Sequence, residues 1–399
     1  MSEWKRYKLN EIASLSNGIN FDKSAYTSGV KLIGVADFKD RVYPDYGSLQ
    51  EVDSKVVRNG DYLEKGDIVF VRSNGNKELV GRCMMIDRDI PVTFSGFCIK
   101  LHLIDKNKFE PAYFNYLFRT REFKKVMTGT AVGANIQNLS QSRLGNCEIN
   151  VPNIETQREL AIIISRYDSL IENYQKQIKL LEESAQRLYK EWFIDLRFPG
   201  HENTKFVDGI PEGWKKGILD DIAYESGEKI DKSNRDKYEN YLPIDCLPKH
   251  SLTYLTPADI SLAESSLVSF EEDDILFGAM RPYFHKVCFA QSKGLTRSTC
   301  FVLNSKEKEY REFLLMLLFD DNSVKHATSI SVGTTMPYTR WKEFKLMNII
   351  IPAKDIALSF SQNLFRIIKA LKNLSSQIHL LTESRDRLLP KLMSGEIEV

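Results

Sequence analysis

The sequence predicts an α+β protein with two tandem α+β globular domains, separated by two long helices that form an antiparallel intramolecular coiled coil. Three observations support this fold class. The chain repeats itself at an offset of 200 residues. Two segments carry long heptad stripes of apolar residues, and short apolar runs typical of strands fill the regions between them. Because each half contains one domain and one helix, we expect a pseudo-twofold relation between the halves.

The repeat is clearest in two helical segments. The stretch QIKLLEESAQRL (177–188) returns as QIHLLTESRDRL (377–388), and eight of the twelve residues are identical. Proline-terminated apolar runs, INVPN and IIIPA, precede these segments and are also 200 residues apart. Further upstream the offset drifts, as loop insertions would cause, and WKRYKLNEIA (4–13) resembles WKKGILDDIA (214–223). The chain order is therefore domain, helix, domain, helix.

Each predicted helix has one narrow apolar stripe with alternating spacings of three and four. The first stripe is Leu160, Ile164, Tyr167, Ile171, Tyr174, Ile178, Leu181, Ala185, Leu188 and Trp192. The second is Phe360, Leu364, Ile367, Leu371, Leu374, Ile378, Leu381, Leu388 and Leu392, interrupted by Arg385. A sustained repeat of about 3.5 residues specifies a coiled-coil seam. The chain order makes the two helices antiparallel partners. Packing of each helix on its own domain, or homodimerisation through the same stripes, are the alternatives.

These patterns divide the chain into five segments. Strand-like runs occur in both domains, for example GDIVFVRS and CEINVP in the first and DDILFGAM and MNIIIP in the second. Each domain also has a helical run, PAYFNYLFRTREFKKVM or YREFLLMLLFDD, so we expect a mixed, irregular sheet. The segments are domain 1 (1–153), the central helix (154–196), a linker (197–212), domain 2 (213–353) and the C-terminal helix (354–399).

Composition narrows the class of protein only moderately. With 42% hydrophobic and 27% charged residues, the chain resembles an ordinary soluble globular protein. It has no apolar run of about 18 residues and no signal-peptide pattern, so we expect a cytoplasmic protein. The net charge of +1 neither requires nor excludes a nucleic-acid partner. Six scattered cysteines without a CxxC pair predict buried free thiols.

Catalytic motifs are absent from the sequence. It contains no GxxxxGK[ST], no GxGxxG after a strand, no methyltransferase-type Asn/Asp-Pro-Pro-aromatic loop and no GxSxG. The nearest nuclease-like pattern is Pro44-Asp45 followed by Asp53-Ser54-Lys55, which solvated loop charges explain better. The histidines form no HxH or HExxH pattern. We therefore expect no catalytic residue and no metal ligand in this chain.

Polar, glycine-containing loops recur at matching places in the two domains, at 72–82 and 129–143 in the first and at 280–286 and 331–342 in the second. Arginine, asparagine and glutamine can hold a base edge with two hydrogen bonds, and lysine binds phosphate. Ordinary polar turns are the alternative. The candidate DNA-binding residues are Arg72, Asn74, Asn76, Lys77, Arg82, Asn135, Gln137, Asn138, Arg143, Arg281, Tyr283, Lys286, Thr334, Thr335, Tyr338, Arg340 and Lys342.

In their order and twofold repetition, several segments resemble the specificity subunit of type I restriction-modification systems. IPEGWKKGILDDIA (210–223) resembles the Pro-x-Gly-Trp opening of a target recognition domain, although the first repeat lacks Pro-x-Gly before Trp4. LYKEWFIDLRFPG (188–200) resembles the exit from the central helix. The likeness covers essentially the whole chain and continues in GDIVFVRSNGNKELVGR, ANIQNLSQSRLGNCEINVP, DDILFGAMRPYFHKVCFA and GTTMPYTRWKEFKLMNIIIP.

The resemblance implies a non-catalytic subunit of a methyltransferase and endonuclease complex. Each target recognition domain would read half of a split, asymmetric site in double-stranded DNA, and the helices would set the gap. Two modification subunits would dock mainly on the helices and motor-endonuclease subunits would join them, so that S-adenosylmethionine, ATP and Mg²⁺ are expected on the partners. Glu183, Arg187, Glu383 and Arg387, shared by the repeated helical segments, are either a solvated face or two equivalent docking surfaces.

Two other classes of function remain open from the sequence. The chain could be a coiled-coil scaffold without DNA readout, or a self-sufficient DNA nuclease or modification enzyme. Salt-dependent DNA binding distinguishes the scaffold, because a protein that neutralises phosphates releases counterions and binds less tightly as salt rises.

Overall fold

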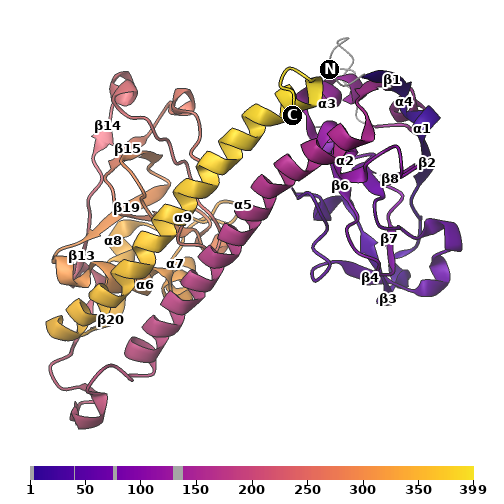
Figure 1. Cartoon of the computed structure of the whole chain (residues 1–399). Coiled ribbons are helices and arrows are strands. Elements are labelled where there is room, and N and C mark those ends of the chain that lie inside the picture. The colour runs from indigo at the N-terminus through magenta and orange to yellow at the C-terminus, as the bar shows by residue number, and fades with distance from the viewer. Residues whose placement is uncertain (1–3, 40, 75–78, 129–137) are drawn as a thin grey trace. The chain divides into compact units, whose positions relative to one another are not determined.

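The computed structural model describes residues 4–39, 41–74, 79–128 and 138–399. The chain divides into two compact units (Figure 1). Unit 1 comprises Met1–Ser169 and Glu383–Val399, and unit 2 comprises Leu170–Thr382. Each unit therefore contains one globular α+β part together with a segment of each long helix.

The two long helices are α5 (Ile154–Tyr189) and α9 (Lys354–Ser394), as the heptad stripes predict. Asn153 begins α5, because its side-chain oxygen accepts a hydrogen bond of 2.9 Å from the backbone N–H of Thr156. A π-helical turn (Lys190–Ile194) follows α5. Gly395 lies just beyond α9 with φ +76, a left-handed conformation that glycine adopts without steric cost.

In unit 2, the two helices pack along the predicted seam and run antiparallel. Ile171 and Ile178 of α5 belong to the same buried cluster as Leu374 and Ile378 of α9. Near the other end of this contact, the ring centroids of Tyr189 and Phe360 are 6.4 Å apart. Since Tyr189 ends α5 and Phe360 lies near the start of α9, the chain directions are opposite. The coiled-coil prediction is confirmed here.

The same helices also pack on the globular part of unit 2. Tyr189 lies 6.1 Å, centroid to centroid, from Phe313 of α6 (Arg311–Phe319). The buried carboxylate of Glu182 accepts hydrogen bonds of 2.7 Å from both the Ser251 hydroxyl and the Leu252 backbone N–H. Burial is the largest influence on this carboxyl group and raises its pKa. The two packing modes, which the sequence presents as alternatives, therefore occur together.

In unit 1, an ion pair explains the interruption of the second stripe. Arg385 Nη1 lies 2.6 Å from Asp168 Oδ1, and both side chains are mostly buried. Asp168 also affects Tyr116: burial is the main cause that raises the pKa of the Tyr116 hydroxyl, and the charge of Asp168 raises it further. The pair is a polar contact between α5 and α9 inside an apolar seam, a kind of contact that favours one register over others. Apolar residues of both helices in unit 1 belong to one buried cluster: Leu160, Ala161, Ile164, Leu389, Leu392 and Met393.

In the described residues of unit 1, the globular part contains three small sheets with strand orders β1-β9, β2-β8-β5-β6 and β4-β3-β7. The strands are β1 (Lys5–Lys8), β2 (Ala13–Asn17), β3 (Tyr26–Ile33), β4 (Gln50–Val52), β5 (Ile68–Val71), β6 (Cys83–Met85), β7 (Val92–Phe94), β8 (Cys98–Leu103) and β9 (Glu148–Val151). The helices are α1 (Leu9–Ile12), α2 (Pro111–Arg119), α3 (Arg121–Thr128) and α4 (Gln141–Gly145).

The globular part of unit 2 repeats this plan with the orders β12-β20, β13-β19-β16-β17 and β14-β15-β18, and adds the pair β10-β11. The strands are β10 (Phe206–Val207), β11 (Ile210–Pro211), β12 (Lys215–Ile218), β13 (Ala223–Glu225), β14 (Lys229–Ile230), β15 (Leu267–Phe270), β16 (Ile275–Gly278), β17 (Val287–Phe289), β18 (Gly294–Arg297), β19 (Cys300–Ser305) and β20 (Asn348–Ile351). The remaining helices are α7 (Asp321–Ser329) and α8 (Trp341–Phe344).

Strand registers confirm the internal repeat and its drifting offset. Lys5 pairs with Val151 in unit 1, and Lys215 pairs with Ile351 in unit 2. The two strands of this ladder thus recur at offsets of 210 and 200 residues. The third sheets are less alike, because β3 and β7 are parallel whereas β15 and β18 are antiparallel.

Several local expectations need correction. Each globular part has several small sheets rather than one, and in unit 1 the sheet β4-β3-β7 is mixed, because it combines an antiparallel and a parallel pair. The first predicted helical run is two helices, because Thr120 takes an extended backbone conformation between α2 and α3. The second run matches α6, and α7 begins after the extended Asp320. All six cysteines are free, but Cys246 is only partly buried.

The nuclease-like carboxylates take part in local contacts. Asp45 forms an ion pair of 2.7 Å with Arg41, and Asp53 accepts a hydrogen bond from the backbone N–H of Lys55. These bonds stabilise surface turns. No helix in the described part of the chain combines the length and the apolarity that a bilayer crossing requires.

Candidate nucleic-acid interface

In unit 1, the structure brings two of the predicted loops together. The loop after β5 and the segment before α4 form an isolated antiparallel bridge between Ser73 and Asn138. Beside it, the backbone N–H of Leu139 donates a hydrogen bond of 2.8 Å to the carbonyl oxygen of Arg72. Polar residues about 65 positions apart in the sequence are thus brought together.

In unit 2, the corresponding loops meet in the same way. Met280 and Tyr338 form the equivalent antiparallel bridge. The backbone N–H of Thr339 donates a hydrogen bond of 2.9 Å to the carbonyl oxygen of Ala279. The backbone N–H of Arg281 donates another, of 2.7 Å, to Pro337. The matching loops in the sequence are therefore also matching loops in the two folds.

A third loop, which the sequence patterns did not indicate, joins the pair of predicted loops in each unit. The backbone N–H of Arg72 donates to the carbonyl oxygen of Phe97 at 2.8 Å, and that of Ala279 donates to Thr299 at 2.9 Å. Phe97 is 62% exposed. The glycine before Phe97 could have indicated this loop, since glycine often marks a place where the chain passes close to another segment. In the structure, a Cβ at Gly96 would lie 2.1 Å from Asn20 Oδ1. We call each set of three loops a loop cluster.

Several candidate side chains in unit 1 support the loop cluster from within. Arg82 Nη1 donates to the carbonyl oxygen of Lys39 at 3.2 Å, and Arg143 Nε donates to Met127 at 2.7 Å. Arg72 is half-buried, and its Nη1 makes a long contact of 3.5 Å with the Gly96 carbonyl oxygen. Asn138 is exposed and Asn74 half-buried. Four candidates lie outside the described residues: Asn76, Lys77, Asn135 and Gln137.

The candidates of unit 2 separate into supports and exposed groups. Lys286 Nζ donates to the Ile244 carbonyl oxygen at 2.6 Å, and the Tyr338 hydroxyl donates to Ser298 at 3.1 Å. Arg281 Nη2 donates to the carbonyl oxygen of Thr335 at 3.2 Å, while its buried Nε has no hydrogen-bond partner among the residues that the structure describes. The exposed candidates are Tyr283, Thr334, Thr335, Arg340 and Lys342. Arg297, also exposed and close to this loop cluster in the chain, was not predicted.

The candidate partner-binding residues lie on the outer faces of the long helices. Glu183 is partly exposed, and Arg187, Glu383 and Arg387 are exposed. Arg387 forms an ion pair with Glu383 along α9.

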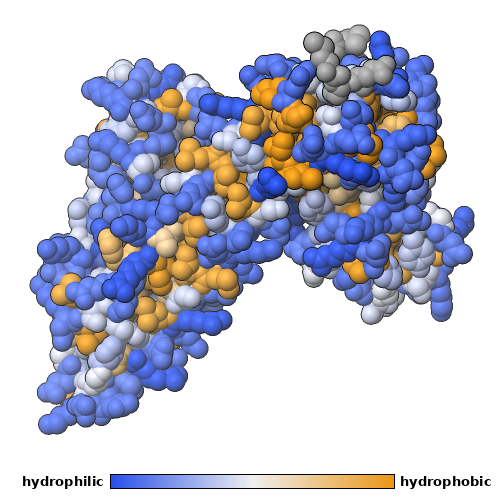
Figure 2. Space-filling model, in the orientation of Figure 1, coloured by the Kyte–Doolittle hydropathy of each residue, from blue (hydrophilic) through white to orange (hydrophobic). Residues whose placement is uncertain are grey.

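Two exposed leucines that the sequence analysis missed adjoin these charges. Leu180 is 62% exposed and Leu380 is 60% exposed, and both occupy the same position of the repeated segment. Apolar side chains show on the visible surface of the long helices in Figure 2. The signal in the sequence was the duplicated Leu-Leu, whose first leucine does not belong to the seam.

Comparison with known proteins places these features in a family. Residues 1–183 and 211–389 match the family of the type I restriction modification DNA specificity domain. The MjaIX specificity subunit of a type I restriction enzyme from Methanocaldococcus jannaschii is 29% identical over 320 residues, covering 75% of this chain and 72% of the relative. The HindI specificity subunit from Haemophilus influenzae is 22% identical over an alignment of 469 residues that spans 100% of both chains.

A solved structure shares the fold. The S subunit of a type I restriction-modification system from M. genitalium superposes with a TM-score of 0.61 at 15% identity, covering 98% of this chain and 96% of that one. The two matches to the family and the shared fold lead to the same assignment. The chain belongs to the family of type I restriction-modification DNA specificity domains.

Proposed function

We propose that this chain is the specificity subunit of a type I restriction-modification complex, in which each loop cluster reads one half of a split DNA site. The observation that carries this proposal is the construction of the same cluster twice from different side chains. A repeated scaffold keeps the geometry of docking, and its differing side chains give each copy its own base preference.

The exposed side chains differ in kind between the two clusters. Unit 1 presents Asn138 and Phe97, whereas unit 2 presents Tyr283 and the cations Arg340 and Lys342. Asparagine can pair with adenine, and arginine with guanine or with phosphate. We therefore expect two unlike half-sites and an asymmetric recognition sequence.

The paired helices are proposed to set the gap between the half-sites. The same face of B-DNA returns after about 34 Å, so two readers must be held at a fixed separation and twist. A coiled coil resists bending and twisting, whereas a flexible linker samples many separations. The apolar seam and the Arg385–Asp168 pair support this role, because both restrict sliding of α5 along α9.

The duplicated outer faces of the helices are proposed to bind two modification subunits. By helical spacing, Leu180, Glu183 and Arg187 share one face of α5, as their repeats share one face of α9. An exposed leucine beside charged groups matches the composition of a protein interface better than that of a purely solvated helix.

Replacing Leu180 by glutamate should remove one modification subunit, and combining it with Leu380→Glu should remove both. The introduced carboxylates would have to be desolvated at the interface. The masses of the purified complexes measure this outcome. Gln186→Glu serves as the matched control, because Gln186 is exposed and lies about 120° around the helix from Leu180. An unchanged complex with both leucines replaced would contradict the proposed docking face.

Catalysis is proposed to belong to the partner subunits. S-adenosylmethionine, ATP and Mg²⁺ would bind there, and motor-endonuclease subunits would join the assembly. The type I restriction enzyme relatives are named as specificity subunits. This chain would supply recognition and positioning, and we propose that it works in the cytoplasm with the DNA it reads.

Duplex binding by the chain with its modification partners should weaken steeply as salt rises. Each phosphate contact contributes about −0.9 to the slope of log K against log salt. Arg340→Ala and Lys342→Ala should each reduce the magnitude of this slope by about 1. Fluorescence anisotropy at several salt concentrations measures it, with Arg88→Ala as the control, because Arg88 is exposed in unit 1 and lies outside the loop cluster. A complex without duplex affinity would support the scaffold alternative instead.

A further inference from the structure

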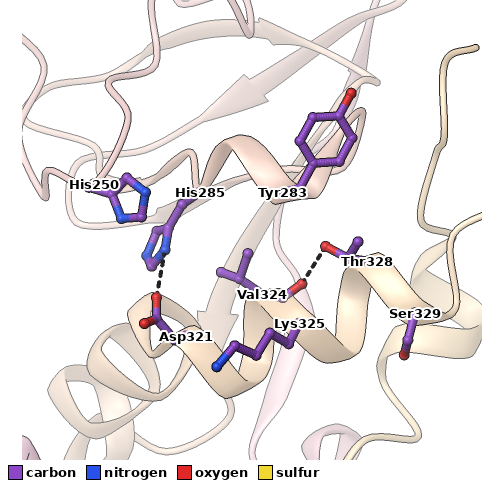
Figure 3. Close-up of a pocket in the computed structure, with 8 residues that line it drawn as sticks. All are labelled: His250, Tyr283, His285, Asp321, Val324, Lys325, Thr328 and Ser329. Carbon is purple, nitrogen blue, oxygen red and sulfur yellow. Dashed lines mark hydrogen bonds and ion pairs between the residues drawn. The ribbon is translucent and has the colours of Figure 1, made fainter. Parts of the chain in front are cut away.

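Unit 2 contains a cluster of metal-binding side chains that the reading of DNA does not explain. His250, His285 and Asp321 come from three separate segments, and one potential ligand atom from each lies within 4.8 Å of the others. They border a pocket of about 390 Å³, which Tyr283 and Lys325 also line (Figure 3). This cluster is not apparent from the sequence, because the two histidines are 35 residues apart and match no metal-binding spacing.

His285 is held in an orientation that suits a metal ligand. Its side chain is buried, and Nε2 lies 2.8 Å from the backbone carbonyl oxygen of Phe319. A carbonyl oxygen only accepts, so Nε2 carries the hydrogen and the neutral ring has its lone pair on Nδ1. Histidines that bind metals are commonly fixed in this way by a hydrogen bond from the other ring nitrogen.

The lone pair on Nδ1 faces another acceptor. Nδ1 of His285 lies 3.2 Å from Oδ1 of Asp321, the interaction drawn in Figure 3. A neutral ring and a carboxylate in this arrangement require a positive species between them, either a proton or a metal ion. Two ligands bound tetrahedrally to zinc at about 2.0–2.1 Å are about 3.3 Å apart. The observed separation therefore fits two ligands of one ion.

His250 supplies the third ligand from the other side. Its ring centroid lies 4.2 Å from that of His285, and its backbone N–H donates a hydrogen bond of 2.9 Å to the His285 carbonyl oxygen. The backbone thus fixes the two segments together, and the exposed His250 ring has a potential ligand atom within 4.8 Å of those of His285 and Asp321. Water from the pocket would complete the coordination.

We propose that His250, His285 and Asp321 bind one divalent transition-metal ion, with zinc as the preferred ion. Two imidazoles and one carboxylate form a donor set typical of zinc with an open fourth position. The ion would join the segment before His250, the Pro282–Phe284 turn after β16 and the start of α7. That turn carries the exposed Tyr283, so metal binding would hold part of the loop cluster of unit 2 in place.

Zinc binding by the purified full-length chain tests this proposal. After chelator treatment and dialysis, titration calorimetry with zinc should show one tight site per chain, and bound cobalt should give the visible absorption of a tetrahedral ion. His250→Gln and Asp321→Asn should each weaken zinc binding at least about tenfold. His379→Gln removes an exposed histidine of α9 and should leave the affinity unchanged.

The buried His285 is left intact in these variants so that folding is retained, which circular dichroism checks. Zinc should raise the unfolding temperature of the original chain but not that of the double variant His250→Gln/Asp321→Asn. Absence of zinc binding by the original chain would overturn the proposal and leave a proton as the bridging species. Equal zinc binding by the double variant would also overturn it.

Discussion

Replacing Arg72 by alanine is expected to relax or abolish recognition of one half of the split site, while the other half remains readable. Arg72 lies where the three loops of unit 1 meet, and its backbone bonds to both Phe97 and Leu139. Among the described residues, its side chain contacts only the Gly96 carbonyl oxygen, at 3.5 Å, so most of its N–H groups remain for a base or a phosphate. Loss of a two-pronged base contact costs about 1–3 kcal/mol, or roughly 5- to 160-fold in discrimination.

Arg281→Ala is the complementary experiment in unit 2. Arg281 reaches the Thr335 carbonyl oxygen through Nη2. Its replacement should affect the half-site that Arg72→Ala leaves intact. Sequencing of methylated adenines in cells that carry each variant with its modification partner measures both halves at once. Arg88→Ala is the control, because Arg88 is exposed in unit 1 and lies outside the loop cluster. Loss of both halves in either variant, or of neither, would contradict the division of labour.

Inserting one helical turn into both long helices is expected to lengthen the gap between the half-sites. Four residues placed after Ser169 and four after Thr382 lie at the boundaries between the compact units. Each insertion adds about 6 Å, or up to about two base pairs of duplex. Four residues keep an apolar seam continuous with only a local change of twist, and equal insertions leave the helices in register.

An insertion into α5 alone provides the control. It lengthens one helix without its partner, so the seam and the Arg385–Asp168 pair compete for different registers. This variant should unfold at a lower temperature and should not read a longer gap. An unchanged gap after the double insertion would show that the helices do not set the spacing.

Local patterns were sufficient to predict the architecture. The seam follows from apolar spacing, because only residues such as Ile178 and Ile378 recur on one helical face and are buried. The loop clusters were foreseen in part, since Arg72 and Arg281 follow matching strands of a repeat. The repeat also allowed for loop insertions, which the strand registers bear out.

Contacts between distant residues could not be read from the same patterns. Glu182 and Glu183 are adjacent glutamates, yet only Glu182 is buried and accepts a hydrogen bond from Ser251. The sequence pattern does not distinguish them, because Ser251 is 69 residues away in the chain. Arg385 interrupts the apolar stripe, and its ion-pair partner Asp168 is 217 residues away in the sequence. The same holds for Phe97 and for the histidine cluster, whose members meet only after the loops fold.

Methylome sequencing of cells carrying the unaltered chain with its cognate modification subunit tests the central claim most directly. The account predicts methylated adenines within one split motif, with two unlike specified halves and a constant gap between them. A continuous motif, a variable gap or two identical halves would contradict it, because two different loop clusters on a fixed spacer would then not determine the site.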